Sequence, residues 1–220
     1  MNKKLLMSLI MCSIVISICI AKGNNQQQEE NNIFVELKQN INALHSKDDE
    51  DREKANKIIL NNYDQIINEL IKLVEVKLEP EPSIEVQKAE DGKYYAKEQA
   101  IMLLGYLRAA KAVPVLMENL EFKNPFVLGP ISYTSVGNLY KTAGSLVNIG
   151  MPAVEPVLFQ LKNFNKDGSI DKICCWIIKE ILGVKLAKAC IQIAIDETQV
   201  ETEKKNLSEA LTYIENSFNN

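Results

Sequence analysis

The residues that could do chemistry in this chain are few, and the first to consider are its histidine and its clustered carboxylates. His45 is the only histidine, so any Ser–His or Cys–His catalytic pair would depend on it. The acidic run 48–51 could attract a cation, but it lacks the glycine turn and the spaced ligands of a calcium loop. No Gly-rich phosphate loop, G-x-S-x-G or HExxH motif occurs. The sequence therefore predicts no catalytic residue, no metal site and no cofactor.

The cysteines are the other reactive group. Cys12 and Cys19 lie in an apolar N-terminal stretch, and the remaining three are Cys174, Cys175 and Cys190. A bridge between the adjacent pair would be strained, because neighbouring helical residues point about 100° apart. Their apolar neighbours predict small buried hydrophobes, with a disulfide from Cys190 to one of the pair as the alternative. No CxxC spacing indicates a metal site.

The first residues have the pattern of a targeting segment. Lys3 and Lys4 precede the apolar stretch 5–20, and small residues at Cys19 and Ala21 occupy the positions that a signal peptidase reads. We predict a cleaved signal peptide over 1–21, and hence an exported protein, periplasmic or extracellular. The alternatives are an uncleaved N-terminal anchor and a lipoprotein with lipid on Cys19. Polar residues 22–32 predict a flexible linker, which leaves 33–220 as the folded domain.

Composition limits the class of this domain. The chain is 46% hydrophobic and 25% charged, with a formal net charge of −4. Without a dense Lys/Arg stripe, nucleic acid is not an expected partner, because phosphate neutralisation drives such binding. Apart from the leader, no membrane contact is expected. Low aromatic content (6%) and few hairpin turn signals favour an all-α domain over a β-sandwich.

Apolar residues recur at helical spacing along most of the body. In 54–76 the stripe changes phase near 61–64, which predicts a turn between two short antiparallel helices. Prolines at positions 80 and 82 predict a loop over 78–92. The pattern then predicts helices over 94–107, 112–122, 137–149, 153–163, 170–182, 185–195 and 202–218.

An internal repeat organises the centre of the chain. Residues 100–116 align without gaps to 142–158. This 42-residue shift predicts the equivalent pairs Leu104 with Leu146, Leu107 with Ile149, Pro114 with Pro156, and Val115-Leu116 with Val157-Leu158. The repeat predicts two copies of a helical hairpin, each with a proline opening its second helix.

The pattern A-x-x-x-L-G-x-L followed by A-V-P-x-L-x-x-x-L, over residues 100–120, resembles the HEAT-like repeats first noted in phycobilin lyases. The resemblance is good again at 142–161 and degenerate at 170–195. It implies a short α-solenoid of stacked antiparallel hairpins, HEAT-like or armadillo-like. Lyase activity does not follow from it, because such repeats occur in many non-enzymes.

The sequence therefore favours a non-enzymatic protein that binds a protein partner with its repeat surface. The alternatives are an accessory or regulatory subunit of an envelope enzyme complex, and a small-molecule or pigment-related enzyme with a deep apolar pocket. The irregular segment 123–135, with Phe126, Tyr133 and the later Tyr140, is a second candidate contact. The candidate binding residues on the second helices are Glu118, Asn119, Glu155, Gln160 and Gln192.

Overall fold

The computed structural model describes residues 48–78, 84–125, 136–165 and 167–218. Every element in these ranges is an α-helix or a short 3-10 helix, and they contain no strand, so the all-α prediction is confirmed. The described residues fall into two compact units. Unit 1 holds those up to Ala100 with Asn124 and Pro125, and unit 2 holds Ile101–Lys123 and those from Val136 onward. The predicted leader, the linker and His45 lie outside the described residues.

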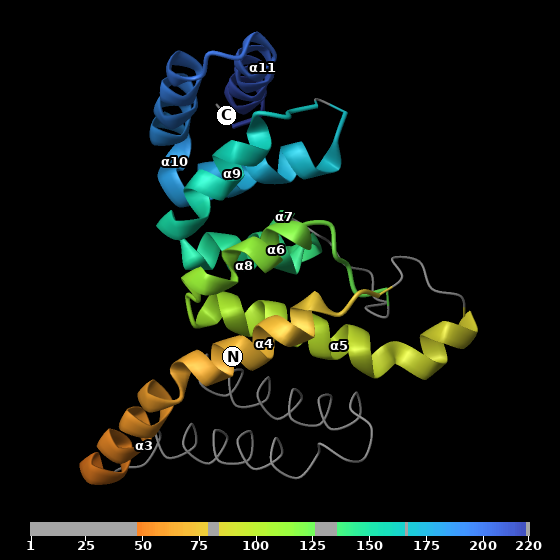
Figure 1. Ribbon diagram of the computed structural model, residues 1–220, viewed down its shortest axis with the longest axis vertical. Helices are drawn as coiled ribbons and strands as arrows, with labels where there is room; N and C mark the ends of the chain where they lie inside the picture. The colour runs from red at the N-terminus through yellow and green to blue at the C-terminus, as the bar shows by residue number, and fades with distance from the viewer. Residues whose placement is uncertain (1–47, 79–83, 126–135, 166, 219–220) are drawn as a thin grey trace. The chain divides into compact units, whose positions relative to one another are not determined.

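Unit 1 begins with two consecutive helices, α3 (Asp49–Asn61) and α4 (Tyr63–Glu75). The backbone N–H of Glu50 donates to the Asp48 carboxylate at 2.8 Å. The acidic run therefore opens a helix, where negative charge is favourable. The predicted break is present at Asn62, but the predicted reversal is wrong. Figure 1 shows α4 running on in nearly the direction of α3, because a single non-helical residue (φ −101°, ψ 4°) does not turn the chain back.

The third helix of this region starts earlier than the sequence predicted. α5 spans Ile84–Tyr106, so the second half of the predicted 78–92 loop is helical and contains Gly92. A glycine inside a helix costs only about 1 kcal/mol relative to alanine. The good helix formers around it and the buried side chains of Tyr94 and Ala96 outweigh that cost.

A buried lysine joins α4 to α5 within unit 1. The Lys97 ammonium donates to the carbonyl of Val76, the residue after α4, at 2.7 Å. A cation at this end of a helix satisfies a free carbonyl and complements the helix dipole. The Lys97 side chain is only 4% exposed, and its burial lowers the pKa of the ammonium to about 8. The buried face of α4 that packs in this unit consists of Ile66, Ile67, Leu70 and Val74.

Unit 2 is a succession of short paired helices (Figure 1). The end of α5 is followed by a 3-10 turn and α6, then by α7, α8, a second 3-10 turn and α9. The chain finishes with two long helices, α10 and α11, which pack side by side. The bounds are η1 Ala110–Ala112, α6 Val113–Glu118, α7 Val136–Leu139, α8 Lys141–Ile149, η2 Met151–Ala153, α9 Val154–Leu161, α10 Ser169–Glu197 and α11 Glu201–Phe218.

The end of α5 and the middle of α8 approach each other unusually closely. The Ser145 hydroxyl donates to the Ile101 carbonyl at 2.8 Å, inside the core. A Cβ atom placed on Gly105 would lie 2.6 Å from the Ser145 Cα atom and 2.7 Å from its Cβ and Oγ atoms. Backbone meets backbone at this point. Glycine is therefore required at position 105 by the packing of the two hairpins, and not by the conformation of its own helix.

The two central hairpins repeat, but with a slip in register that the gapless alignment missed. In the first helices the 42-residue shift holds, since Leu104 and Leu146 are both fully buried. In the second helices the buried side chains repeat 41 residues apart. They are Ala112 with Ala153, Val113 with Val154, Leu116 with Val157, and Leu120 with Leu161. The predicted pairing of Leu116 with Leu158, which is only half-buried, is therefore wrong.

The turn between the paired helices explains the slip. In the first copy the Ala109 N–H reaches back five residues to the Leu104 carbonyl (3.0 Å), with Arg108 at φ 52°. In the second copy the Gly150 N–H reaches back only four residues, to Leu146 (3.0 Å). The first turn is therefore one residue longer. Proline opens α6 as predicted, whereas Pro156 is the third residue of α9 and the η2 turn carries Pro152.

The third hairpin of unit 2 is contained within α10. Gly183 adopts φ 74° and ψ 160°, so the helix is two helices joined at a kink, at the position where the sequence predicted a turn. Arg108, Gly150 and Gly183 are the positive-φ residues of the described chain, and each separates the two helices of a pair. α11 covers the end, with Leu207, Ala210 and Ile214 buried.

Substitutions of Arg108 and Gly150 in these turns are expected to change the free energy of unfolding in opposite directions. Arg108 has a left-handed backbone that costs an L-residue about 1–2 kcal/mol, which glycine would avoid while losing more chain entropy. We expect Arg108→Gly to raise the free energy of unfolding by about 0.5 kcal/mol. Gly150→Ala has space for its Cβ atom, yet its φ of 83° should cost about 1–3 kcal/mol. Urea unfolding of both variants checks this, and a change of the same sign in both would contradict it.

Candidate functional site

The five predicted binding residues are distributed over three helices of unit 2. Glu118 on α6, Glu155 on α9 and Gln192 on α10 are exposed, whereas Asn119 and Gln160 are half-buried. The Asn119 amide is engaged locally, because it donates to the Val115 carbonyl at 2.8 Å and ends α6. Gln192 donates to Asp196 on its own helix at 2.9 Å. The structure thus leaves Glu118, Glu155 and Gln192 as surface groups.

Large apolar side chains are exposed on the second helices of the last two hairpins and on the η2 turn that precedes α9. Met151 and Phe159 are 66% and 68% exposed, and Leu186 and Ile193 are 60% and 54% exposed. Phe159 lies one helical turn beyond Glu155 on the outer face of α9. Leu186 and Ile193 are two turns apart on one face of α10. We call Met151 with Phe159 the α9 strip, and Leu186 with Ile193 the α10 strip.

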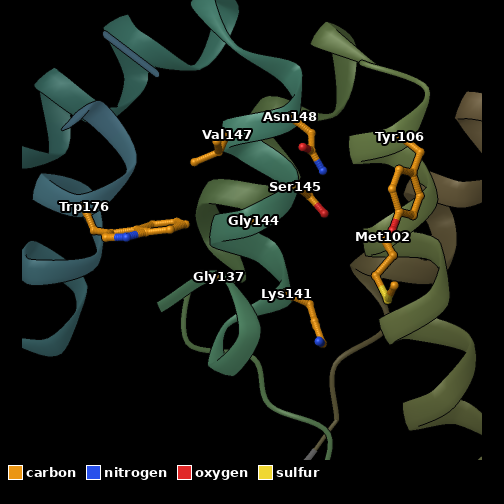
Figure 2. A pocket seen from close by; sticks show the side chains of 9 residues that line it. All are labelled: Met102, Tyr106, Gly137, Lys141, Gly144, Ser145, Val147, Asn148 and Trp176. Atoms are coloured by element: carbon orange, nitrogen blue, oxygen red, sulfur yellow. The ribbon is translucent and has the colours of Figure 1, made fainter. Parts of the chain in front are cut away.

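A pocket of about 300 Å³ lies beside α8, within unit 2. Figure 2 shows Trp176 of α10 on one side of α8, and Met102 and Tyr106 of α5 on the other. α8 itself supplies Lys141, Ser145 and Asn148. Gly137 and Gly144 also line the pocket, and a Cβ atom on Gly137 would lie 2.8 Å from the Cη2 atom of Trp176, so the tryptophan ring packs directly against this glycine.

Most polar groups of this pocket have no hydrogen-bond or ion-pair partner among the described residues. Among the described residues, the Lys141 ammonium, the Asn148 amide and the Tyr106 hydroxyl make no hydrogen bond or ion pair. The Ser145 hydroxyl uses its proton on the Ile101 carbonyl, so it remains an acceptor. No carboxylate lines the pocket. The geometry therefore combines one cation and two neutral donors with aromatic and thioether walls.

Cys174 and Cys175 are fully buried in the first half of α10, Cys190 is half-buried, and all three are free. The predicted buried hydrophobes are found, and the alternative disulfide from Cys190 is not. Burial, assisted by the nearby Asp171 charge, raises the pKa of Cys175 to about 12. Burial also raises the pKa of Cys174 far above its usual range. Neither thiol is a nucleophile at neutral pH, because the thiolate is the reactive form.

The two buried thiols predict a loss of stability in alkali. Thiols of the unfolded chain ionise near pH 9, while the folded chain keeps its protons up to about pH 12. The folded state therefore binds more protons in this window, and its stability falls as pH rises. In this window each thiol lowers the free energy of unfolding by on the order of 1 kcal/mol per pH unit. Lys97 acts in the opposite sense between about pH 8 and 10.5, because its pKa is lowered to about 8 in the folded chain, so urea unfolding at a series of pH values should show the fall most clearly above about pH 10.5.

The matched variants isolate the cause of that slope. Cys174→Ala/Cys175→Ala should flatten the pH dependence relative to the parent chain, even if both chains differ in absolute stability. Cys190→Ala is the control and should keep the parent slope. An unchanged slope in the double variant would show that other groups cause the alkaline loss.

Asp171 is the buried carboxylate of unit 2, and it holds the turn before α10. Its Oδ2 atom accepts the Asn165 N–H at 3.0 Å, and its Oδ1 atom has no hydrogen-bond partner in the described structure. Burial raises the pKa of this carboxyl against the lowering effect of its backbone hydrogen bonds. Asp171 lies in the first turn of a helix, where a carboxylate is stabilised. Its hydrogen bond to the Asn165 N–H explains it as a structural residue that ties the loop to the start of α10.

Within the described ranges, no three His, Cys, Asp or Glu residues come together as a metal site. None of the described helices is long and apolar enough to cross a membrane. Of the second candidate contact, Phe126 and Tyr133 lie outside the described residues. Tyr140 is half-buried, with the Lys123 ammonium 4.7 Å from its ring centroid.

Sequence reasoning missed both the exposed strips and the pocket. Leucine, isoleucine and valine at helical spacing are core by default, and in α9 the buried positions are Val154, Val157 and Leu161. A helical wheel of α9 in this register places Phe159 on the opposite face, so that signal was present. The pocket gave no such signal, because Tyr106, Lys141 and Trp176 come together only in the folded chain.

Comparison with protein-family models, with curated proteins and with solved structures gives no match. The function is therefore argued from the residues of this chain.

Proposed function

We propose that this chain is a non-enzymatic protein that binds another protein with the outer faces of its second helices. The observation that carries the proposal is the exposure of the α9 and α10 strips. Four large apolar side chains, each more than half exposed, stand on helices that have already buried their opposite faces. Exposed aromatic and aliphatic anchors with a polar surround are typical of protein interfaces.

The polar side chains around the strips fit the rim of such an interface. On α9, the exposed Glu155 lies within the α9 strip. On α10, the exposed Lys185 comes directly before the α10 strip, and the exposed Gln192 adds a neutral group. The next lysine, Lys188, is half-buried and already pairs with Glu215 of α11 at 2.7 Å. A partner that meets both strips would therefore present apolar side chains, with a basic residue toward Glu155 and an acidic residue toward Lys185.

We further propose that unit 2 is a short HEAT-like solenoid of three hairpins, closed by α11. Three features support this arrangement. Each helix pair is separated by a positive-φ residue, the first two pairs repeat their buried positions, and α9 packs on α10. In a solenoid, each hairpin contacts its neighbours and leaves one row of helices for binding. The accessory-subunit alternative would use the same surface.

Export through residues 1–21 is the proposed route to that partner. Mass spectrometry of the chain recovered from its native host tests it directly. A mature chain that begins at residue 22 is expected. A chain that still carries the apolar stretch would indicate an uncleaved anchor, and lipid on Cys19 would indicate a lipoprotein.

Photo-crosslinking in the native host tests the proposed surface. A photoreactive amino acid is placed at Phe159 or at Ile193, and at Thr212, an exposed position on α11, as the control. We expect the same protein to crosslink from both strips and not from Thr212. Equal crosslinking from all three positions, or none from the strips, would overturn the proposal. A crosslink to a second copy of the chain would make the strips a self-association surface instead.

A further inference from the structure

We infer that the pocket beside α8 binds a small organic carboxylate with a flat apolar body. The inference is independent of the protein-binding strips, because none of their residues lines the pocket. It rests on the charge, the free donors and the walls of this pocket.

The positive charge of Lys141 favours an anionic ligand in this pocket. Lys141 is the only lysine or arginine in the lining, which has no aspartate or glutamate. In the described chain this ammonium has no ion pair, although acidic residues are more numerous than basic ones in the protein as a whole. A carboxylate placed here would gain a charge-assisted hydrogen bond without displacing a protein partner.

The neutral donors favour a carboxylate group over a simple ion. The Asn148 amide follows Lys141 by two turns on α8, and Tyr106 belongs to α5, with its hydroxyl on the side of Met102 (Figure 2). Both are free of hydrogen bonds within the described residues. A carboxylate has two oxygens and accepts several hydrogen bonds at once, so it can use the ammonium and a neutral donor together.

The walls favour a flat apolar body. Trp176 and Met102 both line the pocket, on opposite sides of α8 (Figure 2), and the Trp176 ring lies against Gly137, where an added Cβ atom would be 2.8 Å from the Cη2 atom of the ring. The volume of about 300 Å³ is at the lower end of ligand-binding pockets. It suits a ligand of one ring or a short branched chain, and it is too small for a large cofactor.

The single tryptophan gives a direct readout, because Trp176 is the only one in the chain and lines the pocket. Phenylacetate is the probe, and 2-phenylacetamide is its neutral counterpart of the same shape. We expect phenylacetate to change Trp176 emission saturably, with a dissociation constant on the order of 1 mM for so small a ligand. The amide should bind about tenfold more weakly or worse, because it lacks the charge.

Variants identify the residue that recognises the charge. Lys141→Met keeps the length of the side chain and should weaken phenylacetate binding by about tenfold or more. Lys205→Met, at an exposed lysine on α11 outside the pocket, is the matched control and should bind as the parent does. Backbone amide shifts of Gly144, Ser145 and Asn148 in NMR titrations provide a second readout.

Two results would overturn the inference. One is the absence of any saturable change in Trp176 emission and in these amide shifts. The other is a loss of charge recognition, seen as equal affinity for phenylacetate and its amide or as an equal loss in Lys141→Met and Lys205→Met. Either result would leave the proposed protein-binding strips untouched, since crosslinking from Phe159 does not depend on the pocket.

Discussion

Gly105→Ala is expected to lower the free energy of unfolding by about 2–3 kcal/mol. Helix propensity alone predicts the opposite sign, because alanine is about 1 kcal/mol better than glycine inside a helix. The added Cβ atom, however, would stand 2.6 Å from the Ser145 Cα atom. A backbone atom cannot move aside as a flexible side chain does. The two hairpins must therefore separate, and the buried Ser145–Ile101 hydrogen bond is weakened with them.

A double variant tests the cause. Ser145→Gly in the Gly105→Ala background removes the Ser145 Cβ and Oγ atoms but leaves its Cα atom in the way. We expect partial recovery of stability and not full recovery. Urea unfolding of the single and double variants gives the comparison. A Gly105→Ala chain as stable as the parent would show that α5 and α8 do not meet at this point.

Leu104→Ala and Leu146→Ala are each expected to cost about 2–5 kcal/mol. Both side chains are fully buried at equivalent positions of the two repeated hairpins. Removing either leaves a cavity between helices that are held by neighbours on both sides, so the site cannot collapse completely. The matched control is Leu186→Ala, the same change at a side chain that is 60% exposed, for which we expect an effect within about 0.5 kcal/mol.

Chemical denaturation of the three variants distinguishes repeat packing from a general effect of leucine loss. Leu104→Ala and Leu146→Ala should shift the midpoint by similar amounts, because the two positions are structurally equivalent. If either one unfolds like Leu186→Ala, that position is not part of a tightly packed core, and the repeat loses its structural basis.

Most of the helices could be predicted because their core residues recur every three or four positions. This spacing predicted the buried face of α4, which consists of Ile66, Ile67, Leu70 and Val74. It also predicted the face of α11 that holds Leu207 and Ile214. Such a stripe depends only on local geometry. The kink at Gly183 could also be predicted from the sequence, since one apolar stripe ends before this glycine and another begins after it.

The errors arose where the decisive forces act between distant residues. Asp91 and Gly92 end the loop predicted over 78–92, yet they lie inside α5, where the buried side chains of Tyr94 and Ala96 anchor the helix. The single-residue slip between the hairpins depends on the left-handed conformation of Arg108. Arginine gives no local signal for such a conformation. A gapless alignment therefore placed Leu158 in the core, although Val157 is the buried residue.

The candidate surfaces were harder still. Apolar residues on a helix are core by default, so the sequence did not separate exposed Phe159 from buried Leu161. The pocket draws on α5, α8 and α10, and none of its polar groups lies in a recognisable motif. Two of the predicted binding residues that remain on the surface lie beside the strips. Glu155 flanks Phe159 and Gln192 flanks Ile193.

The most direct test of the proposed function is the affinity of the partner that crosslinks from Phe159, measured by calorimetry with purified proteins. Phe159→Glu/Ile193→Glu should weaken binding by about 100-fold or more, since buried apolar anchors contribute about 2 kcal/mol or more each. Its unfolding midpoint should stay close to that of the parent, because both side chains are more than half exposed. Thr212→Glu is the control. Equal affinity of the parent and the double variant would contradict the assignment of these helices as the binding surface.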